Sequence, residues 1–218
     1  MLDLLVRLLA AYLLGSVNGA LVIGRFRGVD IRTQGSGNAG GTNALRTQGW
    51  AFALGVIVID VAKAVIAVQF LPTAVAPPVI AVEWLAVICG FGAVIGHVYP
   101  VFHGFRGGKG VATVLGTLLA LSLPLLLGML AVWFVMMFLF GYVGLGSMVA
   151  AASLPLLVQL GAARGWVTPA EVLPLTTFGI ICAAFVIWTH RSNIVRMRAG
   201  TEPRARKLWL LGRLVGRS

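Results

Sequence analysis

Glycine, amide and cationic residues gather in three short polar segments of an otherwise apolar chain. The first, residues 25–48, contains the run GSGNAGGTNALR, whose glycines allow tight turns that present backbone N–H groups to an anion. The side chains that add donors are Ser36, Asn38, Thr42, Asn43 and Arg46. A guanidinium fork beside hydroxyl and amide groups suits a phosphate group. A flexible cytoplasmic loop is the alternative, although an ordinary linker does not interleave so many donors with glycine.

The second polar segment, residues 102–110, sets a lysine among glycines where a new apolar run begins. Lys109 lies between Gly108 and Gly110, and Gly107 precedes them. This arrangement has the physics of a phosphate cradle at a helix N-terminus. It is not a Walker A loop, because His103 stands where the first glycine is required and no Ser or Thr follows the lysine directly. Nucleotide hydrolysis is therefore unsupported, and a simple cytoplasmic anchor is the alternative for Lys109.

The third polar segment, residues 189–203, sets His190 and Asn193 three residues apart at the end of the last apolar run. Three residues span about one helical turn, so both side chains can lie on one helix face. They form a candidate pair for orienting a substrate hydroxyl, although an interfacial histidine also serves structural purposes. His97, which shortly precedes Tyr99, leaves the same two alternatives open, and His103 is interpreted as interfacial.

Composition shows what must position these segments. Hydrophobic residues make up 59% of the chain, charged residues only 11%, and the mean hydropathy is +0.98. Such values are typical of a polytopic membrane protein. We therefore expect one integral membrane domain over residues 1–218, with residues 2–24 as a retained first span rather than a signal peptide. Cys89 and Cys182 lie in apolar runs and are interpreted as small hydrophobes.

Charge predicts the topology, because cytoplasmic loops are enriched in Lys and Arg. All three polar segments are basic and should face the cytoplasm. Residues 49–102 then hold two spans, joined by a turn that contains Pro72, Pro77 and Pro78. Residues 111–188 hold four short spans, with breaks near 122–124, 141–147 and 164–171. The prediction is an all-α protein of about seven transmembrane helices, with the N-terminus outside and the C-terminus in the cytoplasm. A basic rim against anionic lipid explains the net charge of +11 without nucleic acid.

Asp60 and Lys63 lie three residues apart inside the second apolar run. Ionisable groups in a membrane are costly and are usually paired, so we expect these two to neutralise each other. A transporter of phosphorylated solutes could use them as a coupling pair instead. That alternative predicts polar residues near the bilayer centre in several spans, whereas the polar residues here gather at one membrane face.

The three motifs GSGNAGGTNALR, GHVYPVFHGFRGGKGVAT and HRSNIVRMRAGTE resemble those of the acyl-phosphate:glycerol-3-phosphate acyltransferase family, PlsY, over nearly the full chain. The resemblance implies a bacterial inner-membrane enzyme with its active site on the cytoplasmic side. It would transfer a fatty acyl group from acyl phosphate to the primary hydroxyl of sn-glycerol 3-phosphate, giving lysophosphatidic acid and phosphate in the first acylation of phospholipid synthesis. It also implies a monomer without cofactor or metal, linked to an enzyme that produces acyl phosphate.

The resemblance assigns roles to the candidate residues. His190, Asn193 and Lys109 would be catalytic, with either His190 or a phosphate oxygen of the substrate accepting the hydroxyl proton. Two anionic substrates repel each other, and Lys109 with Arg46 would offset that charge. The substrate-binding set would be Ser36, Asn38, Thr42, Asn43, Arg46, His97, Gly107, Gly108, Gly110 and Ser147.

The chain departs from the family pattern in three places. Asn18 replaces a proline in the first span, and Gly41 replaces an alanine. The loop that reads Arg-Tyr-x-Ser-Leu-x-Ser in relatives is GYVGLGS at residues 141–147, so only its last serine, Ser147, and its tyrosine and leucine remain. A relative with an altered acceptor or weaker activity is therefore an alternative. An acyltransferase that uses acyl-CoA or acyl carrier protein is disfavoured, because no histidine begins a His-x-x-x-x-Asp dyad.

Overall fold

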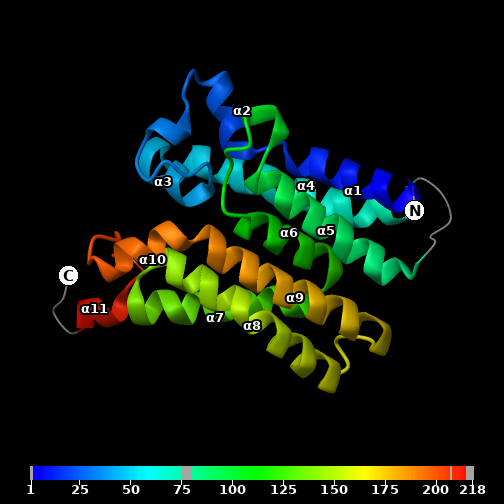
Figure 1. Ribbon diagram of the computed structural model, residues 1–218. Helices are drawn as coiled ribbons and strands as arrows, with labels where there is room; N and C mark the ends of the chain where they lie inside the picture. The colour runs from blue at the N-terminus through cyan, green and yellow to red at the C-terminus, as the bar shows by residue number, and fades with distance from the viewer. Residues whose placement is uncertain (1, 75–79, 207, 215–218) are drawn as a thin grey trace. The chain divides into compact units, whose positions relative to one another are not determined.

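The computed structural model describes residues 2–74, 80–206 and 208–214, and every regular element within them is a helix. The chain divides into two compact units, an N-terminal unit (Met1–Leu121) and a C-terminal unit (Ser122–Ser218), which are described separately below. Figure 1 identifies the helices of each by label and colour. The expectation of a single domain stays a prediction. Of the three prolines expected in the outer turn, Pro72 lies inside the last turn of the helix Trp50–Ala74, so that part of the prediction is wrong, and Pro77 and Pro78 lie outside the described residues.

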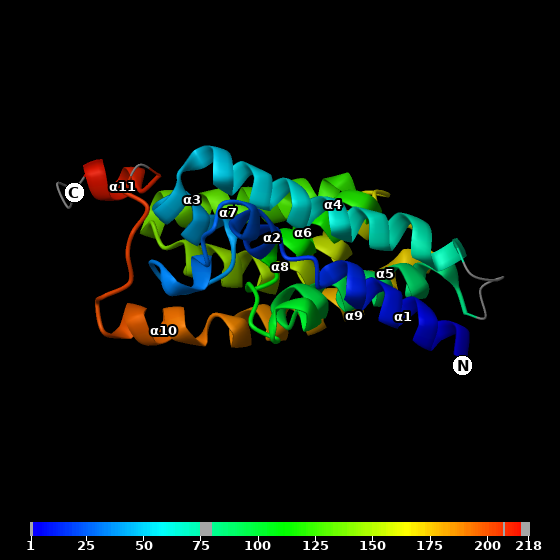
Figure 2. The same ribbon diagram turned by 90° about the horizontal axis from the view of Figure 1, so that it is seen from above.

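In the N-terminal unit, one long helix forms the centre of the packing. Helix α4 (Trp50–Ala74) contacts five other helices of this unit. These are α1 (Leu2–Gly15), α2 (Gly19–Phe26), α3 (Gly41–Gln48), α5 (Val82–Val98) and α6 (Val111–Leu121). Two single-turn 3₁₀ helices, η1 (Ile31–Thr33) and η2 (Val101–His103), lie in the first and second polar segments. Figure 2 shows α4 extending past the short helices α2 and α3.

The expected first span is broken. Helices α1 and α2 meet at an angle of 46° across residues 16–18. Asn18 caps the second helix, because its side-chain oxygen accepts a hydrogen bond from Leu21 N at 3.2 Å. An N-terminal cap satisfies a backbone N–H that the helix leaves unpaired. Asn18, at the position where the family has proline, therefore begins a new helix.

Close contact between backbones joins α1 to α5. A Cβ atom on Gly96 would collide with Tyr12 O, and one on Gly15 would collide with Ala93 O. Small residues permit this approach, which provides dispersion contacts between membrane helices. Arg7 fastens α1 to the far end of α4. Its guanidinium is fully buried, pairs with Asp3 at 3.0 Å, and donates to the carbonyls of Leu71 and Pro72.

In the described part of the C-terminal unit, the chain forms three long helices and two short ones. Helix α8 (Val143–Ala163) packs against α7 (Leu123–Phe140) and α9 (Pro169–Thr189). The short helix α10 (Arg191–Arg198) contacts both α8 and α9. The short helix α11 (Leu210–Leu214) contacts α7. Helix α9 begins with a capping box between Thr168 and Glu171. The three breaks expected near residues 122–124, 141–147 and 164–171 all fall at helix boundaries, so these predictions are confirmed.

Fewer helices than expected meet the criteria of length and apolarity for a membrane span. Among the described residues, five helical segments are long and apolar enough to cross a membrane, and the bent pair α1–α2 makes a sixth if it counts as one span. Helix α6 is apolar, but its 11 residues extend only about 16 Å at 1.5 Å per residue, short of a hydrocarbon core of about 30 Å. Seven spans are therefore not confirmed, and the orientation of the termini remains a prediction.

Candidate active site

The first polar segment is folded around one buried amide. Asn43, 1% exposed, accepts a hydrogen bond from Ser36 N at 2.9 Å and donates to Ile31 O at 3.1 Å and Gln34 O at 2.9 Å. Its amide is thus engaged with the backbone of its own segment, although the sequence predicted a substrate contact. This leaves Ser36, Thr42 and Arg46 with exposed side chains around the fold that Asn43 maintains.

Arg32 ties the first polar segment to the second. Its guanidinium donates to His103 O at 2.8 Å and to Arg106 O at 3.4 Å. The same group pairs with Asp30 at 2.8 Å, and Asp30 in turn accepts from Arg32 N at the start of η1. The hydrogen bond from Arg32 to the Asp30 carboxylate holds the pKa of that carboxyl below its ordinary value of 3.8. Both polar segments are therefore held in one place within the N-terminal unit.

The glycines of the second polar segment fold back onto the end of α5. Gly107 N donates to Val98 O and Gly108 N donates to His97 O, each at 3.1 Å. These two N–H groups, which the sequence predicted as phosphate donors, are bonded to the protein. Gly110 has φ +87°, a conformation that favours glycine, and the next residue begins α6. Half-buried Lys109 thus stands directly before the N-terminus of a helix, as the sequence predicted.

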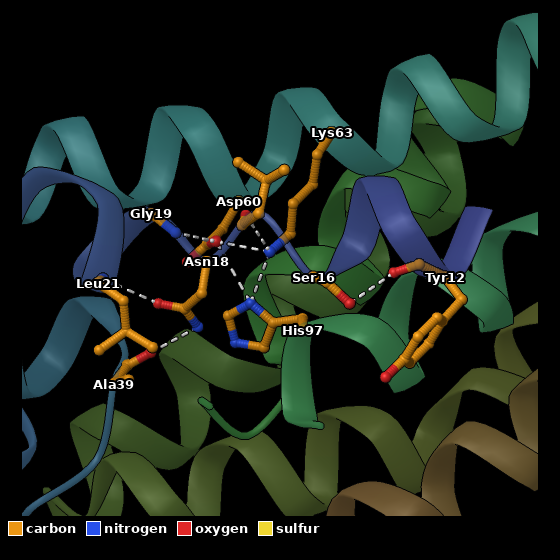
Figure 3. A network of polar contacts seen from close by, with 10 residues as sticks. Tyr12, Ser16, Asn18, Gly19, Leu21, Ala39, Asp60, Lys63 and His97 are labelled. Atoms are coloured by element: carbon orange, nitrogen blue, oxygen red, sulfur yellow. Dashed lines mark hydrogen bonds and ion pairs between the residues drawn. The ribbon is translucent and has the colours of Figure 1, made fainter. Parts of the chain in front are cut away.

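A cluster of buried polar groups lies where α4, α5 and the break between α1 and α2 meet (Figure 3). Lys63 Nζ contacts Asp60 Oδ1 at 2.9 Å, which confirms the predicted neutralisation. The same nitrogen is 2.9 Å from His97 Nδ1 and donates to Val17 O at 3.0 Å. Gly19 N, at the start of α2, also donates to Asp60 Oδ1, at 3.0 Å. His97 is only 2% exposed and faces this cluster, so the structure places it beneath the surface of the N-terminal unit.

The C-terminal unit has its own polar cluster at the junction of α9 and α10. His190, 4% exposed, is bonded through Nδ1 to Val186 O at 2.8 Å. A carbonyl can only accept, so the neutral ring carries its proton on Nδ1 and its lone pair on Nε2. Asn193 N donates to His190 O at 2.8 Å, which puts both residues on one turn. Asn193 Nδ2 donates to Glu202 Oε1 at 2.7 Å.

Glu202 is the member of this cluster that sequence reasoning missed. It is buried, and its second oxygen accepts from Arg196 Nε at 2.7 Å. A buried carboxylate normally has such charged and neutral donors around it. The signal was available, because Glu202 is the only acidic residue in the basic tail after position 190. It holds Asn193 in place by a direct hydrogen bond.

The altered loop at residues 141–147 packs against Asn193, a member of the same cluster. A Cβ atom on Gly144 would lie 2.9 Å from Asn193 Cγ and Nδ2, closer than such contacts normally come. Glycine at this position therefore lets the Asn193 side chain pack directly on the start of α8. Ser147, one helical turn later, is buried and donates to Val143 O at 2.9 Å.

Each unit brings together its own share of the predicted site residues. The N-terminal unit holds both glycine-rich segments, with Arg46 and Lys109 as their cations. The C-terminal unit holds His190, Asn193 and Ser147. Apolar helices of membrane-spanning length that carry glycine-rich, cationic polar segments define an integral membrane protein with cationic sites at its polar segments.

The family is shown directly by comparison with known proteins. The profile of the glycerol-3-phosphate acyltransferase family matches residues 5–200. The chain belongs to this family. Its relatives include the glycerol-3-phosphate acyltransferase of Chlorobaculum parvum, 40% identical over 226 aligned positions that cover 94% of this chain and 97% of that one. The enzyme of the same name from a Synechococcus strain is 41% identical and covers 96% and 98% of the two chains.

Solved structures agree with this assignment. The crystal structure of PlsY (YgiH), an integral membrane glycerol 3-phosphate acyltransferase, in its glycerol 3-phosphate form matches with a TM-score of 0.76 and 35% identity, covering 92% of this chain and 94% of that one. The lysophosphatidic acid form of PlsY matches with a TM-score of 0.75 and 35% identity, covering 95% and 98%. The resemblance drawn from the three motifs is thereby confirmed.

Proposed function

We propose that this protein transfers a fatty acyl group from acyl phosphate to the primary hydroxyl of sn-glycerol 3-phosphate. The hydroxyl oxygen attacks the acyl carbon, a new ester C–O bond forms, and the bond from that carbon to the phosphate oxygen breaks. Phosphate leaves with the electron pair, and the hydroxyl proton passes to a base. The products are lysophosphatidic acid and inorganic phosphate. An acyl phosphate is already activated, so no cofactor or metal is required.

The observation that carries this proposal is the joining of two cationic, glycine-rich segments within the N-terminal unit. Arg32 ties them by hydrogen bonds to His103 O and Arg106 O, and each segment brings a cation, Arg46 or Lys109. Two phosphorylated substrates carry charges that repel each other, and fixed cations offset that repulsion without reorganising during the reaction. PlsY structures with glycerol 3-phosphate and with lysophosphatidic acid support the acceptor and the product.

The proposed phosphate contacts follow from what remains accessible. We assign Ser36, Asn38, Thr42 and Arg46 to the glycerol phosphate. Lys109 and the N–H groups in the first turn of α6, which have no carbonyl within the helix to bind, are assigned to the acyl phosphate. Since the N–H groups of Gly107 and Gly108 bond to α5, these glycines would act by letting the chain fold closely onto that helix.

The proposed role of His190 follows from its tautomer. With Nδ1 donating to Val186 O, Nε2 holds the lone pair and can accept the hydroxyl proton. Asn193, fixed by Glu202, would help to orient the hydroxyl. Positioning of two reactants provides up to about 7–11 kcal/mol of the barrier reduction in well-oriented reactions, so binding geometry carries most of the proposed catalysis.

The cellular setting belongs to the same proposal. The basic polar segments would face the cytoplasm of a bacterial inner membrane, where phosphorylated substrates are dissolved. The bent α1–α2 pair and α6 would complete seven spans, with the N-terminus outside. The enzyme would act as a monomer next to an enzyme that supplies acyl phosphate, and membrane lipid would receive its product.

The decisive experiment gives detergent-purified protein palmitoyl phosphate, with and without glycerol 3-phosphate, and palmitoyl-CoA in a parallel reaction. We expect phosphate release that depends on glycerol 3-phosphate and matches lysophosphatidic acid formation mole for mole. Product from palmitoyl-CoA alone would replace the proposed donor. Phosphate release that does not depend on glycerol 3-phosphate would indicate a hydrolase. Folded protein that produces nothing from either donor would refute the proposal.

A further inference from the structure

The buried cluster of Asp60, Lys63 and His97 is difficult to explain as a source of stability. Ionisable groups within membrane spans are costly, and a buried ion pair is often no more stabilising than apolar residues of similar size. Its geometry is also incomplete. Asp60 Oδ1 collects the contacts of the cluster, whereas Oδ2 is buried without a hydrogen-bond partner among the described residues. The buried Asp60–Lys63 ion pair therefore needs an explanation other than stabilisation of the fold.

The contacts of the cluster run toward the polar segments. From α4, Asp60 and Lys63 bind both sides of the α1–α2 break, because Gly19 N donates to Asp60 Oδ1 and Lys63 donates to Val17 O. Asn18, within that break, donates to Ala39 O at 3.2 Å. Ala39 belongs to the glycine-rich run of the first polar segment. The cluster is thus linked to this run through one intervening side chain, that of Asn18 (Figure 3).

His97 carries the contact to the second polar segment. His97 Nδ1 lies 2.9 Å from Lys63 Nζ and 3.2 Å from Asp60 Oδ1, so this edge of the ring faces the ion pair and the opposite edge carries Nε2. That edge of the ring faces Gly108, because a Cβ atom added there would collide with Nε2. The same Cβ atom would lie 2.8 Å from Ala39 O. Gly108 therefore lies where the ring of His97 meets both polar segments.

Lys109 is the next residue after this meeting point. The backbone position of Lys109 depends on Gly108, which His97 contacts in two ways. The His97 ring packs against Gly108, and the His97 carbonyl accepts a hydrogen bond from Gly108 N at 3.1 Å. We propose that Asp60, Lys63 and His97 are positioning residues that fix the Gly108–Lys109 backbone against the first polar segment and so set the affinity for the phosphate of the donor. His97 then acts through the glycine segment rather than by touching substrate. This inference rests on the proposed function.

The main test removes the ion pair without leaving a lone charge. In Asp60→Leu/Lys63→Met, both charges are lost together, so folding should be retained, as judged by thermal unfolding in detergent. We expect KM for palmitoyl phosphate and Kd for inorganic phosphate to rise about tenfold or more, in parallel. Gln69→Leu is the matched control, since Gln69 is a polar residue of the same helix and donates to Ala120 O outside the cluster. A folded double variant whose KM and phosphate Kd stay within twofold of wild type would overturn the proposal.

A second pair of variants decides the matter if the double variant fails to fold. In His97→Gln the side-chain amide reaches the place of Nε2, whereas in His97→Asn it reaches only the place of Nδ1. Positioning of Gly108 by the Nε2 edge predicts a KM near wild type for His97→Gln and a KM raised about tenfold for His97→Asn, compared at equal amounts of folded protein. Equal values or the reverse order would refute the role.

The phosphate Kd keeps this inference separate from the proposed reaction. If wild-type protein makes no lysophosphatidic acid from palmitoyl phosphate, the proposed donor is wrong. The affinities of the same variants for inorganic phosphate still report whether the cluster positions Lys109. Conversely, an active wild-type enzyme with unchanged phosphate Kd in the folded double variant and in His97→Asn would retain the function and reject the cluster's role.

Discussion

Two buried histidines in this protein have different partners at the same ring nitrogen. His97 Nδ1 faces an ion pair, 2.9 Å from Lys63 Nζ and 3.2 Å from Asp60 Oδ1, whereas His190 donates from Nδ1 to Val186 O, which leaves the lone pair of the neutral ring on Nε2. Both rings are almost fully buried, at 2% and 4% exposure. Burial therefore does not decide what a histidine does, and the partner of one nitrogen fixes the chemistry of the other.

The largest effect is expected when the same substitution, histidine to glutamine, is made at both positions, which tests the comparison directly. A glutamine amide can reach the place of Nε2 but cannot take up a proton as imidazole does. His190→Gln should therefore lower kcat by about 10²–10⁴-fold, the range for loss of a general base, whereas His97→Gln should retain most activity. The measurement is initial phosphate release at saturating substrates.

His103→Gln is the control for this comparison, because His103 is the third histidine of the chain and has no proposed role in catalysis. Its activity should remain close to wild type. If His190→Gln retained its kcat, the proton acceptor would be a phosphate oxygen of the substrate. A loss in His97→Gln as great as in His190→Gln would remove the distinction between the two rings.

A second prediction concerns the buried carboxylate in each of the two polar clusters. Asp60 lies beside a buried lysine, whereas Glu202 accepts from the neutral amide of Asn193 and from Arg196. Asn193→Asp would set a second carboxylate where the present distance to Glu202 Oε1 is 2.7 Å. Like charges this close are strongly unfavourable, so we expect the free energy of unfolding to fall by about 3 kcal/mol.

The measurement is chemical or thermal unfolding in detergent, with Asn193→Asp compared to Asn193→Ala. The alanine variant loses the hydrogen bond without adding charge and should lose about 1–3 kcal/mol, the cost of an unsatisfied buried partner. Equal stability of the two variants would show that Glu202 is not held as a carboxylate near this position.

Restoring the residue that relatives have should harm this protein. Gly144→Ser would place a Cβ atom 2.9 Å from Asn193 Cγ, near His190, as a Cβ atom on Gly108 would meet the ring of His97. Overpacking of this kind costs about 1–3 kcal/mol, and displacement of Asn193 should lower kcat about tenfold. Gly128→Ser is a control in the same unit, because its Cβ atom would meet only the end of the Leu157 side chain, at 3.1 Å. A gain of activity in Gly144→Ser would contradict the packing argument.

The smallest expected effect concerns the exposed pair Asp30–Arg32. Because the bond to Arg32 lowers the pKa of Asp30, the pair stabilises the fold fully above the ordinary value of 3.8 and loses this contribution as pH falls through the lower folded value. Arg32→Gln should lose about 0.2–1 kcal/mol at neutral pH, as is typical of exposed pairs. The difference from wild type should narrow in acid, measured by unfolding across a pH series. A difference that does not change with pH would assign the effect to the carbonyl contacts of Arg32 alone.

Sequence patterns predicted the features that depend on local spacing. Asp60 and Lys63 pair because residues three apart share a helix face. The helix boundaries after Leu121 and Phe140 follow from polar, proline or glycine residues between apolar runs. The three polar segments and their family also followed from the sequence, because their motifs are long and specific.

Features that depend on distant partners could not be predicted. The sequence could not show that the N–H groups of Gly107 and Gly108 bond to α5, because a glycine N–H can face either a ligand or a carbonyl. The Asn43 amide had the same ambiguity, and the fold uses it to organise its own segment. Glu202 reaches Asn193 only because the chain reverses after α10, and no spacing rule predicts that turn.

The 2.9 Å contact between Asp60 and Lys63 has a consequence for how the protein enters the membrane. A charge at the centre of a spanning helix costs about 2.5–3.5 kcal/mol on insertion scales. Both charges lie within one turn of α4, so this helix can leave the translocon already neutralised, before α5 is synthesised. Gly19 N from α2 and His97 from α5 then complete the cluster inside the bilayer. The ion pair that we propose to position Lys109 would thus first lower the free-energy cost of inserting α4 into the membrane.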